Sequence, residues 1–239
     1  MSIALAIVGT GKMGSLVEQI APDCGFEVRA QFDLANIATL SRKSLNGASV
    51  AIEFTAPGVA PENLRHLAAL GVNTVCGTTG WYDHLPEVRR AVESAGSALV
   101  YAPNFSIGVN LFIETVARAA ALFAQHPEYE AWGWEIHHSA KKDAPSGTLK
   151  KLADEMRCAG FGGALTLSAN RAGAHTGTHE IGFDSPADTI TLRHTARSRE
   201  GFARGALLAA RWIAGKKGVF EFREILNGLG RSSASSAAP

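Results

Sequence analysis

The sequence predicts an α/β fold: a doubly wound parallel sheet, followed by a second α+β domain that carries a mixed sheet. Three observations support this prediction. Short apolar runs alternate with helix-compatible segments over about the first hundred residues, a glycine motif separates the first run from the first helix, and the alternation ends after Val109. We expect residues 1–106 and 199–239 to form the first domain and residues 107–198 to form the second.

The first domain is predicted from its apolar runs and its prolines. Ile3–Val8 is a continuous apolar run of strand length, and a helix is expected over residues 15–21. Pro61 and Pro86 mark the starts of two further helices, because proline is favoured in a first helical turn. The other runs of strand length are residues 28–32, 50–54, 72–76 and 99–101.

The composition is that of an ordinary globular protein. The 239 residues are 46% hydrophobic and 19% charged, and 23 Lys+Arg against 22 Asp+Glu leave a formal charge of +1. This balance argues against a disordered chain and against a nucleic-acid-binding protein. The three cysteines are widely spaced and predict neither a disulfide framework nor a zinc site. We find no membrane-span or signal-peptide pattern and expect a cytoplasmic protein.

Small and polar residues follow every predicted strand of the first domain. Because ligands of open parallel sheets bind outside the carboxyl ends of the strands, this recurrence predicts a ligand site at that edge. The segments concerned are Gly9-Thr10-Gly11, Asp33, Thr55-Ala56-Pro57, Gly77-Thr78-Thr79-Gly80 and Ala102-Pro103-Asn104-Phe105.

The first of these turns contains three glycines at a spacing that allows a sharp turn and lets backbone N–H groups approach a pyrophosphate. It therefore indicates a dinucleotide-binding loop; a glycine turn without a ligand is the alternative. Asp33, nineteen residues after the last glycine, lies where an acid binds the adenosine ribose hydroxyls, unless it is only a solvated strand end. The motif consists of Gly9, Thr10, Gly11, Lys12, Met13 and Gly14.

The identity of residue 33 also bears on the choice between NADH and NADPH. A carboxylate there repels a 2′-phosphate, which favours NADH. Lys12, Arg42 and Lys43 would offset this repulsion if they faced the cofactor, and are otherwise a solvated surface. We expect NADH, with use of both cofactors as the alternative.

After Val109 helices and strands no longer alternate regularly. Helices are expected over residues 110–125 and 146–158, and again over 203–214 after the chain leaves the second domain. The Ser/Ala-rich residues 231–239 are expected to be an unstructured tail. The strands of the second domain are expected at residues 132–136, 165–169, 179–183 and 189–195.

The densest group of reactive side chains lies in residues 135–148, which leave a predicted strand and enter a predicted helix. Apolar residues at helical spacing follow, so Asp143 or Ser146 is the expected helix cap. Lys141 precedes this helix start, and a cation beside unpaired N–H groups suits a carboxylate ligand. The N–H groups are those of Ser146, Gly147 and Thr148.

Two adjacent histidines in this stretch, His137 and His138, are candidates for a proton donor, because an imidazole titrates near neutral pH. Adjacent residues of a strand point to opposite faces, so one of the two is expected to be merely packed or solvated. A metal site is the alternative, which we do not favour, because the other candidate ligands, His175, His179 and His194, are scattered along the chain.

Further motifs occur in a recognisable order: Glu53-Phe54-Thr55, Gly77-Thr78-Thr79-Gly80, residues 102–110, Arg171-Ala172-Gly173, Gly177-Thr178-His179, His194 and Ser198-Arg199. Together with the glycine motif and residues 137–148, they make the chain resemble the 4-hydroxy-tetrahydrodipicolinate reductase family, formerly called dihydrodipicolinate reductase. The likeness covers nearly everything except the tail. The string of residues 137–148 is its most specific part, and the glycine motif its least specific.

The resemblance implies a cytoplasmic enzyme of lysine and diaminopimelate biosynthesis. Such an enzyme uses NADH or NADPH to reduce a cyclic hydroxylated dicarboxylate, with loss of water, to tetrahydrodipicolinate. The resemblance also implies a homotetramer built by the middle domain, and domains that close over the reactants.

The resemblance further assigns roles by position. His137 is the implied proton donor and Lys141 the assisting cation or acid, while His138, Lys141 and the N–H groups of Ser146, Gly147 and Thr148 hold the substrate carboxylates. Gly77, Thr79, Ala102 and Phe105 are implied to line the nicotinamide site. The implied cofactor-binding set comprises the glycine motif, Asp33, Phe54, Thr55, Gly77, Thr78, Thr79, Ala102, Pro103, Asn104, Phe105 and Arg199.

The chain departs from the family in two informative places: residue 34, and a short loop between the second and third predicted strands, which implies different adenosine contacts. Many members have a basic residue just after the acid of the second strand, whereas Leu34 follows Asp33 here, which argues against a strong preference for NADPH. Two other hypotheses remain: a related dinucleotide-dependent dehydrogenase of an amino or hydroxy acid, and a protein that senses NADH without chemistry. The string of residues 137–148 disfavours the first, and the lack of a basic surplus disfavours a DNA-binding sensor.

Overall fold

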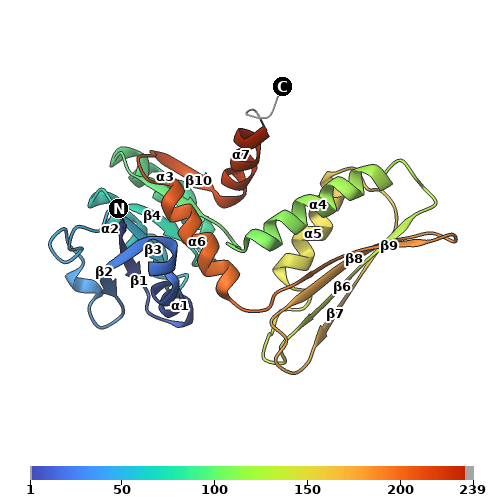
Figure 1. The fold of residues 1–239 in the computed structure, drawn as a ribbon, viewed down its shortest axis with the longest axis horizontal. Coiled ribbons are helices and arrows are strands. Elements are labelled where there is room, and N and C mark those ends of the chain that lie inside the picture. The colour runs from blue at the N-terminus through green and yellow to red at the C-terminus, as the bar shows by residue number, and fades with distance from the viewer. Residues whose placement is uncertain (1, 235–239) are drawn as a thin grey trace. The chain divides into compact units, whose positions relative to one another are not determined.

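The computed structural model describes residues 2–234 and divides the chain into two compact units. The first unit comprises the residues up to Ile107 together with those from Glu200 onward, and the second unit runs from Gly108 to Arg199. Each unit has its own sheet, as Figure 1 shows. Within residues 2–234 no helix combines the length and the apolar character needed to cross a membrane.

The first unit contains a six-stranded parallel sheet in the order β10-β5-β4-β3-β1-β2. The strands are β1 (Ile3–Val8), β2 (Phe26–Phe32), β3 (Val50–Glu53), β4 (Asn73–Cys76), β5 (Ala98–Tyr101) and β10 (Gly218–Glu221). The helices are α1 (Lys12–Ile20), α2 (Ala60–Ala69), α3 (Leu85–Ser94), α6 (Glu200–Trp212) and α7 (Phe222–Ala234). Pro61 and Pro86 lie in the first turns of α2 and α3, so the helix starts predicted from proline are confirmed.

Both faces of this sheet are covered, because its central strands bury side chains on each side. Leu5 and Ile7 of β1 pack into a core with α1 and α6, whereas Ala6 and Val8 belong to a second core that includes Leu67 of α2. A strand buried on both faces has a nearly continuous apolar sequence, as β1 does. The doubly wound parallel sheet predicted from the sequence is therefore confirmed.

Two features of the carboxyl-terminal segment differ from the prediction. The sequence predicts a helix over residues 203–214 and no strand after it, whereas β10 pairs with β5 and adds a strand at the edge of the sheet. A run of four residues has no readable period, so only its pairing partner makes it a strand. The unstructured tail predicted from residue 231 is wrong for its first four residues, since α7 continues to Ala234. An existing helix extends readily through such residues, because propagation costs far less than nucleation. Residues 235–239 lie outside the described part.

The second unit combines two helices with a four-stranded sheet in the order β7-β6-β8-β9. Its strands are β6 (Glu130–His137), β7 (Leu165–Arg171), β8 (Thr178–Asp184) and β9 (Thr189–Thr195), and its helices are α4 (Ile107–Phe123) and α5 (Gly147–Cys158). β6 is parallel to β7, while β8 is antiparallel to both β6 and β9. The sheet is thus mixed, which confirms the α+β prediction for this part of the chain.

Helices α4 and α5 lie over the same face of this sheet (Figure 1). Leu149 and Leu152 of α5 and Val116 of α4 share a core with Ile181 and Phe183 of β8. Side chains alternate along β6, so its residues 131, 133, 135 and 137 are buried while 132, 134 and 136 are only partly covered. This alternation places Glu135 and His137 on the buried face.

Candidate active site

The turn between β1 and α1 approaches the neighbouring strand more closely than any side chain would allow. A Cβ at Gly9, whose φ is +96°, would lie 2.1 Å from the carbonyl oxygen of Phe54, and one at Gly14 would lie 1.9 Å from that of Gly9. Gly11 is the N-cap of α1 and makes no side-chain cap. The first N–H groups of α1 therefore remain available to an anion at this turn.

This turn forms one wall of a cavity of about 950 Å³ in the first unit. Asp33 lies at its rim, where its Oδ1 accepts a hydrogen bond of 2.8 Å from the N–H of Ala35 and its Oδ2 lies 3.5 Å from the Thr10 hydroxyl. An acid and a glycine turn thus share one cavity, as the sequence predicts. The predicted cofactor residues that line it are Gly9, Thr10, Gly11, Asp33, Phe54 and Thr55.

The charges around this cavity are mainly negative. Glu62 of α2 lines it together with Asp33, and His66 lies nearby on the same helix. Within residues 2–234, the cavity wall includes none of the three cations that could have offset a 2′-phosphate. The guanidinium of Arg42 instead lies against Gly71, where a Cβ would come within 2.7 Å of it.

The remaining predicted cofactor residues do not line this cavity. Thr78 is buried and its hydroxyl accepts a 2.8 Å hydrogen bond from the N–H of Thr55, which ties the ends of β3 and β4 together. Phe105 is buried against Phe222, with ring centroids 4.8 Å apart, and Arg199 is exposed at the end of the second unit. The other residues that do not line the cavity are Lys12, Met13, Gly14, Gly77, Thr79, Ala102, Pro103 and Asn104.

A buried carboxylate lies behind the ends of β3 and β4. Glu53 is completely buried and accepts hydrogen bonds from the hydroxyl of Thr55 and from Sγ of Cys76, the latter at 3.1 Å. Burial, with the adjacent Glu53 charge, raises the pKa of the Cys76 thiol well above its ordinary value. Cys76 is therefore a neutral thiol that helps hold Thr55 in place. The sequence marked Glu53 only as part of a family motif.

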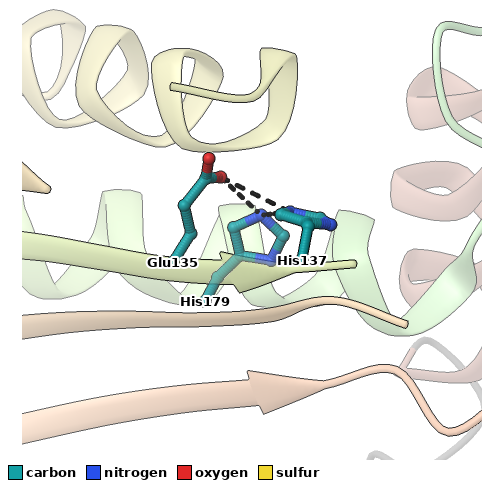
Figure 2. Close-up of side chains that lie close together, drawn as sticks. All are labelled: Glu135, His137 and His179. Carbon is teal, nitrogen blue, oxygen red and sulfur yellow. Dashed lines mark hydrogen bonds and ion pairs between the residues drawn. The ribbon is translucent and has the colours of Figure 1, made fainter. Parts of the chain in front are cut away.

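The second unit brings together four polar side chains from three adjacent strands. Glu135 and His137 come from β6, Arg171 from β7 and His179 from β8. The Nε2 atoms of the two histidines are 3.3 Å apart. Oε2 of Glu135 lies 3.3 Å from Nε2 of His179 and 3.5 Å from Nε2 of His137. Figure 2 shows the carboxylate facing the edges of both rings.

The protonation states in this cluster follow from burial and from its hydrogen bonds. Burial raises the pKa of Glu135, but the hydrogen bonds from His179, Ser146 and Arg171 outweigh it and place the pKa well below its ordinary value. Burial and the adjacent His179 lower the pKa of His137, against the opposing effect of Glu135. Glu135 is therefore ionised, and His137 by itself is mainly neutral near pH 7.

The start of α5 lies beside this cluster. The expectation that the N–H of Ser146 is unpaired is wrong, because it donates a hydrogen bond of 2.7 Å to Oε1 of Glu135. Ser146 is the N-cap, and its Oγ accepts a hydrogen bond of 3.2 Å from the N–H of Leu149. The N–H groups of Gly147 and Thr148 have no intrahelical acceptor, because they belong to the first turn. Of the two cap candidates the structure selects Ser146, since Asp143 pairs with Lys141 at 2.7 Å, a contact that lowers the pKa of Asp143.

The two adjacent histidines differ as predicted: His137 is buried, whereas His138 is half-buried just beyond the end of β6. The sequence analysis disfavoured a metal site because the other histidines are far apart along the chain, and for His179 this reason is wrong. The structure brings ligand atoms of Glu135, His137 and His179 within 4.8 Å of one another. Glu135 already accepts hydrogen bonds from Arg171 and Ser146, so protein donors occupy this carboxylate.

Sequence reasoning assigned no catalytic role to three members of this cluster, Glu135, Arg171 and His179. Glu135 did lie in the reactive stretch 135–148, Arg171 and His179 in motifs of the resemblance, and His179 also among the metal ligands considered. Their contact with His137 arises from strand pairing: β6 pairs with β7 on one side and with β8 on the other.

Two family models match nearly the whole described chain: "Dihydrodipicolinate reductase, N-terminus" over residues 3–105 and "Dihydrodipicolinate reductase, C-terminus" over residues 108–226. The chain belongs to this reductase family. Among curated members, the 4-hydroxy-tetrahydrodipicolinate reductases of Christiangramia forsetii and Methanosarcina mazei are each 32% identical to it. The alignments cover 94% of this chain in both cases, and 98% and 99% of those relatives.

Solved structures show a similar fold. A dipicolinate-bound dihydrodipicolinate reductase from Paenisporosarcina sp. TG-14 has a TM-score of 0.77 at 23% identity, covering 94% of this chain and 100% of that one. An amine dehydrogenase from Mycobacterium smegmatis has a TM-score of 0.63 at 13% identity, covering 93% and 96%. The predicted family and the predicted enzyme class, a dinucleotide-dependent oxidoreductase, are confirmed.

Proposed function

We propose that this protein reduces 4-hydroxy-tetrahydrodipicolinate to tetrahydrodipicolinate in lysine and diaminopimelate biosynthesis. The observation that carries the proposal is family membership over both halves of the chain, with 32% identity to named reductases across nearly their full length. A related amino-acid or hydroxy-acid dehydrogenase and an NADH sensor are not favoured by these relatives.

The first unit binds the dinucleotide in this proposal, and its glycine turn fits that ligand. The turn has no room for a Cβ at Gly9 or Gly14, so the backbone itself forms the surface that faces the pyrophosphate. Asp33 is positioned for the ribose hydroxyls. NADH is the favoured cofactor, because Asp33 and Glu62 both line the cavity and Leu34, which follows the acid, is 93% exposed and carries no charge.

The second unit binds the cyclic dicarboxylate. The N–H groups at the start of α5 and the ammonium group of Lys141 attract carboxylates, and His138 adds a further polar group. These contacts involve a helix terminus and side chains that stand next to His137 in sequence. The substrate residues in this proposal are His138, Lys141, Gly147 and Thr148, while Ser146 acts as the helix N-cap, since its own N–H donates to Glu135.

His137 donates the proton in this mechanism. The dinucleotide, when bound, supplies the hydride. The ring of His137 has a lowered pKa in the free protein, and a doubly negative substrate held at Lys141 raises it again. Substrate binding thus favours the protonated imidazole of His137, which is the form that can donate a proton. Lys141 neutralises the carboxylate charge that would otherwise oppose hydride addition.

We also propose a cytoplasmic homotetramer. The helix-free face of the second sheet carries Trp132, Trp134 and Ile136 of β6, each only partly covered within one chain. Aromatic and aliphatic side chains on a sheet face are typical of an interface between subunits. Size-exclusion chromatography with light scattering tests this proposal directly, and a monomer would contradict it.

A coupled assay tests the proposed reaction. An upstream synthase generates the unstable cyclic substrate in place, and oxidation of NADH or NADPH is followed by absorbance. We expect oxidation that depends on the substrate and is faster with NADH. Cofactor binding without oxidation would favour a sensor, and oxidation only with other amino or hydroxy acids would favour a related dehydrogenase.

A further inference from the structure

The proposed mechanism leaves the buried partners of His137 without a role. Glu135 is fully buried and ionised, and a buried charge is costly unless it is paired and hydrogen-bonded. Here Oε1 accepts a hydrogen bond of 2.8 Å from Nη2 of Arg171 and one of 2.7 Å from the N–H of Ser146. These contacts fix the carboxylate and direct Oε2 toward the two histidines.

The surroundings of His179 determine where its proton lies. Its Nε2 is 3.3 Å from Oε2 of Glu135, 3.3 Å from Oγ of Ser146 and 3.3 Å from Nε2 of His137. The carboxylate oxygen can only accept, and the Ser146 hydroxyl donates its hydrogen to Glu135. Nε2 of His179 therefore carries a hydrogen, because the carboxylate and hydroxyl oxygens beside it act as acceptors.

This arrangement selects the tautomer of His137. Since Nε2 of His179 donates, Nε2 of His137 accepts, and the hydrogen of the neutral His137 ring lies on Nδ1. Gly177, with φ of +139°, leaves space for the ring: a Cβ there would lie 2.8 Å from Cε1 of His137. The ring is thus held on one side by the cluster and on another by Gly177, with Nδ1 turned away from His179.

We propose that Glu135 and His179 are positioning residues that hold the ring of His137 and share with it the proton that the reaction consumes. This inference rests on the proposed function, in which His137 is the donor. In the charged form, one hydrogen lies on Nδ1 of each ring and a third lies between the two Nε2 atoms, with Glu135 balancing the single positive charge.

The proton balance of the step is simple. The proton on Nδ1 of His137 passes to the substrate carbon that holds the electron pair left by hydride addition. The shared hydrogen stays on Nε2 of His137, which lies 3.5 Å from Oε2 of Glu135, and the hydrogen on Nδ1 of His179 remains. Both rings end neutral, each in the opposite tautomer from that of the resting state. Solvent then returns one proton. Within residues 2–234, Nδ1 of His179 has no hydrogen-bond partner, so this hydrogen is not tied to any other group.

Other ionisable groups act on His137 from the neighbouring elements, together with Glu135. His194 pairs with His179 across β8 and β9, and burial and His179 lower its own pKa, so it adds little positive charge. The charged groups that act on the pair are Glu135 on β6, Arg171 on β7, His194 on β9, and Lys141 before α5, whose ammonium pairs with Asp143.

The test measures kcat and KM against pH for Glu135→Gln in the full-length enzyme. Loss of the carboxylate charge lowers the pKa of the histidine pair, so the acid form disappears at lower pH. We expect kcat to fall by about 100-fold, with a smaller change in KM, because a positioned acid contributes about 10²- to 10⁴-fold. The alkaline limb of kcat should move about one pH unit lower, as expected for loss of a nearby opposite charge.

A matched control is Glu128→Gln, which removes a surface carboxylate 3.4 Å from His126 in the same unit. It should leave kcat and its pH profile unchanged. His179→Gln keeps a hydrogen-bond donor but cannot hold a charge, whereas His179→Leu keeps neither, so kcat should fall less in the first than in the second. These variants carry the test if Glu135→Gln does not fold.

The outcomes separate this inference from the proposed function. If the wild-type enzyme does not oxidise NADH with the cyclic substrate, the proposed function is wrong. If the wild type is active and a folded Glu135→Gln or His179→Gln enzyme loses activity equally at every pH, the groups have only a structural role and the inference is overturned. A shifted alkaline limb with a kcat-dominated loss supports it.

Discussion

The two candidate sites of this chain use different means to bind charge. In the first unit the glycine turn presents backbone N–H groups. This turn requires that residues 9 and 14 carry no side chain, because a Cβ at Gly9 or Gly14 would overlap the backbone. In the second unit a buried carboxylate, a guanidinium and two imidazoles from three strands control one another. A backbone site depends on local geometry, whereas a side-chain cluster depends on electrostatics.

The difference teaches that substitutions in the two units should separate cofactor binding from catalysis. A change in the turn should act on dinucleotide affinity, while a change near His137 should act on turnover. The experiments below are ordered by the size of the expected effect.

The largest effect is expected for Lys141→Ala. Loss of the ammonium removes the cation nearest to the N–H groups at the start of α5, so kcat/KM should fall by at least about 100-fold, as when a group that stabilises developing charge is lost. NADH affinity, measured by fluorescence titration, should stay largely intact. A large loss of NADH binding would refute the division between the two units. Lys142→Ala, a change at the exposed next residue, is the control.

Gly14→Ala should weaken binding of the dinucleotide without affecting the second unit. The added methyl group would overlap the carbonyl oxygen of Gly9, at 1.9 Å, so the turn must open. We expect the Kd for NADH to rise about tenfold or more, which corresponds to about 1.4 kcal/mol. Gly58→Ala is the matched control, because nothing lies within 4 Å of its added Cβ. Unchanged NADH binding in the folded Gly14 variant would show that the turn is not the cofactor site.

Asp33→Ala should change cofactor choice more than overall activity. Loss of the ribose contact should weaken the affinity for NADH by up to about tenfold. The affinity for NADPH should fall less or should rise, because repulsion of its 2′-phosphate is relieved. The ratio of kcat/KM for the two cofactors measures this shift. Equal losses for both would contradict a ribose contact. Glu93→Ala, on the surface of α3, serves as the control.

The smallest effect is expected for a chelator. Arg171 and Ser146 already engage Glu135, so the enzyme should keep full activity after dialysis against EDTA. An activity loss that Zn²⁺ restores would show instead that Glu135, His137 and His179 bind a metal, as their spacing would allow.

Local features were the predictable part of the fold. Pro61 and Pro86 act within one helical turn, so the starts of α2 and α3 could be derived from the sequence, which also reduced the cap of α5 to Asp143 or Ser146. β10 could not be derived, because a four-residue strand exists only through its pairing with β5. The helical residues at the end of α7 were missed because composition alone does not show where an existing helix stops.

The same distinction holds for the sites. The sequence by itself determined the glycine turn, the acid at residue 33 and the histidine and lysine string before α5, because each is a short-range pattern with its own physical requirement. Only the tertiary structure decided that His179, 42 positions from His137, shares a proton environment with it and with Glu135. Strand pairing sets that proximity, and burial then makes the charges interact strongly, since a low-dielectric interior screens them little.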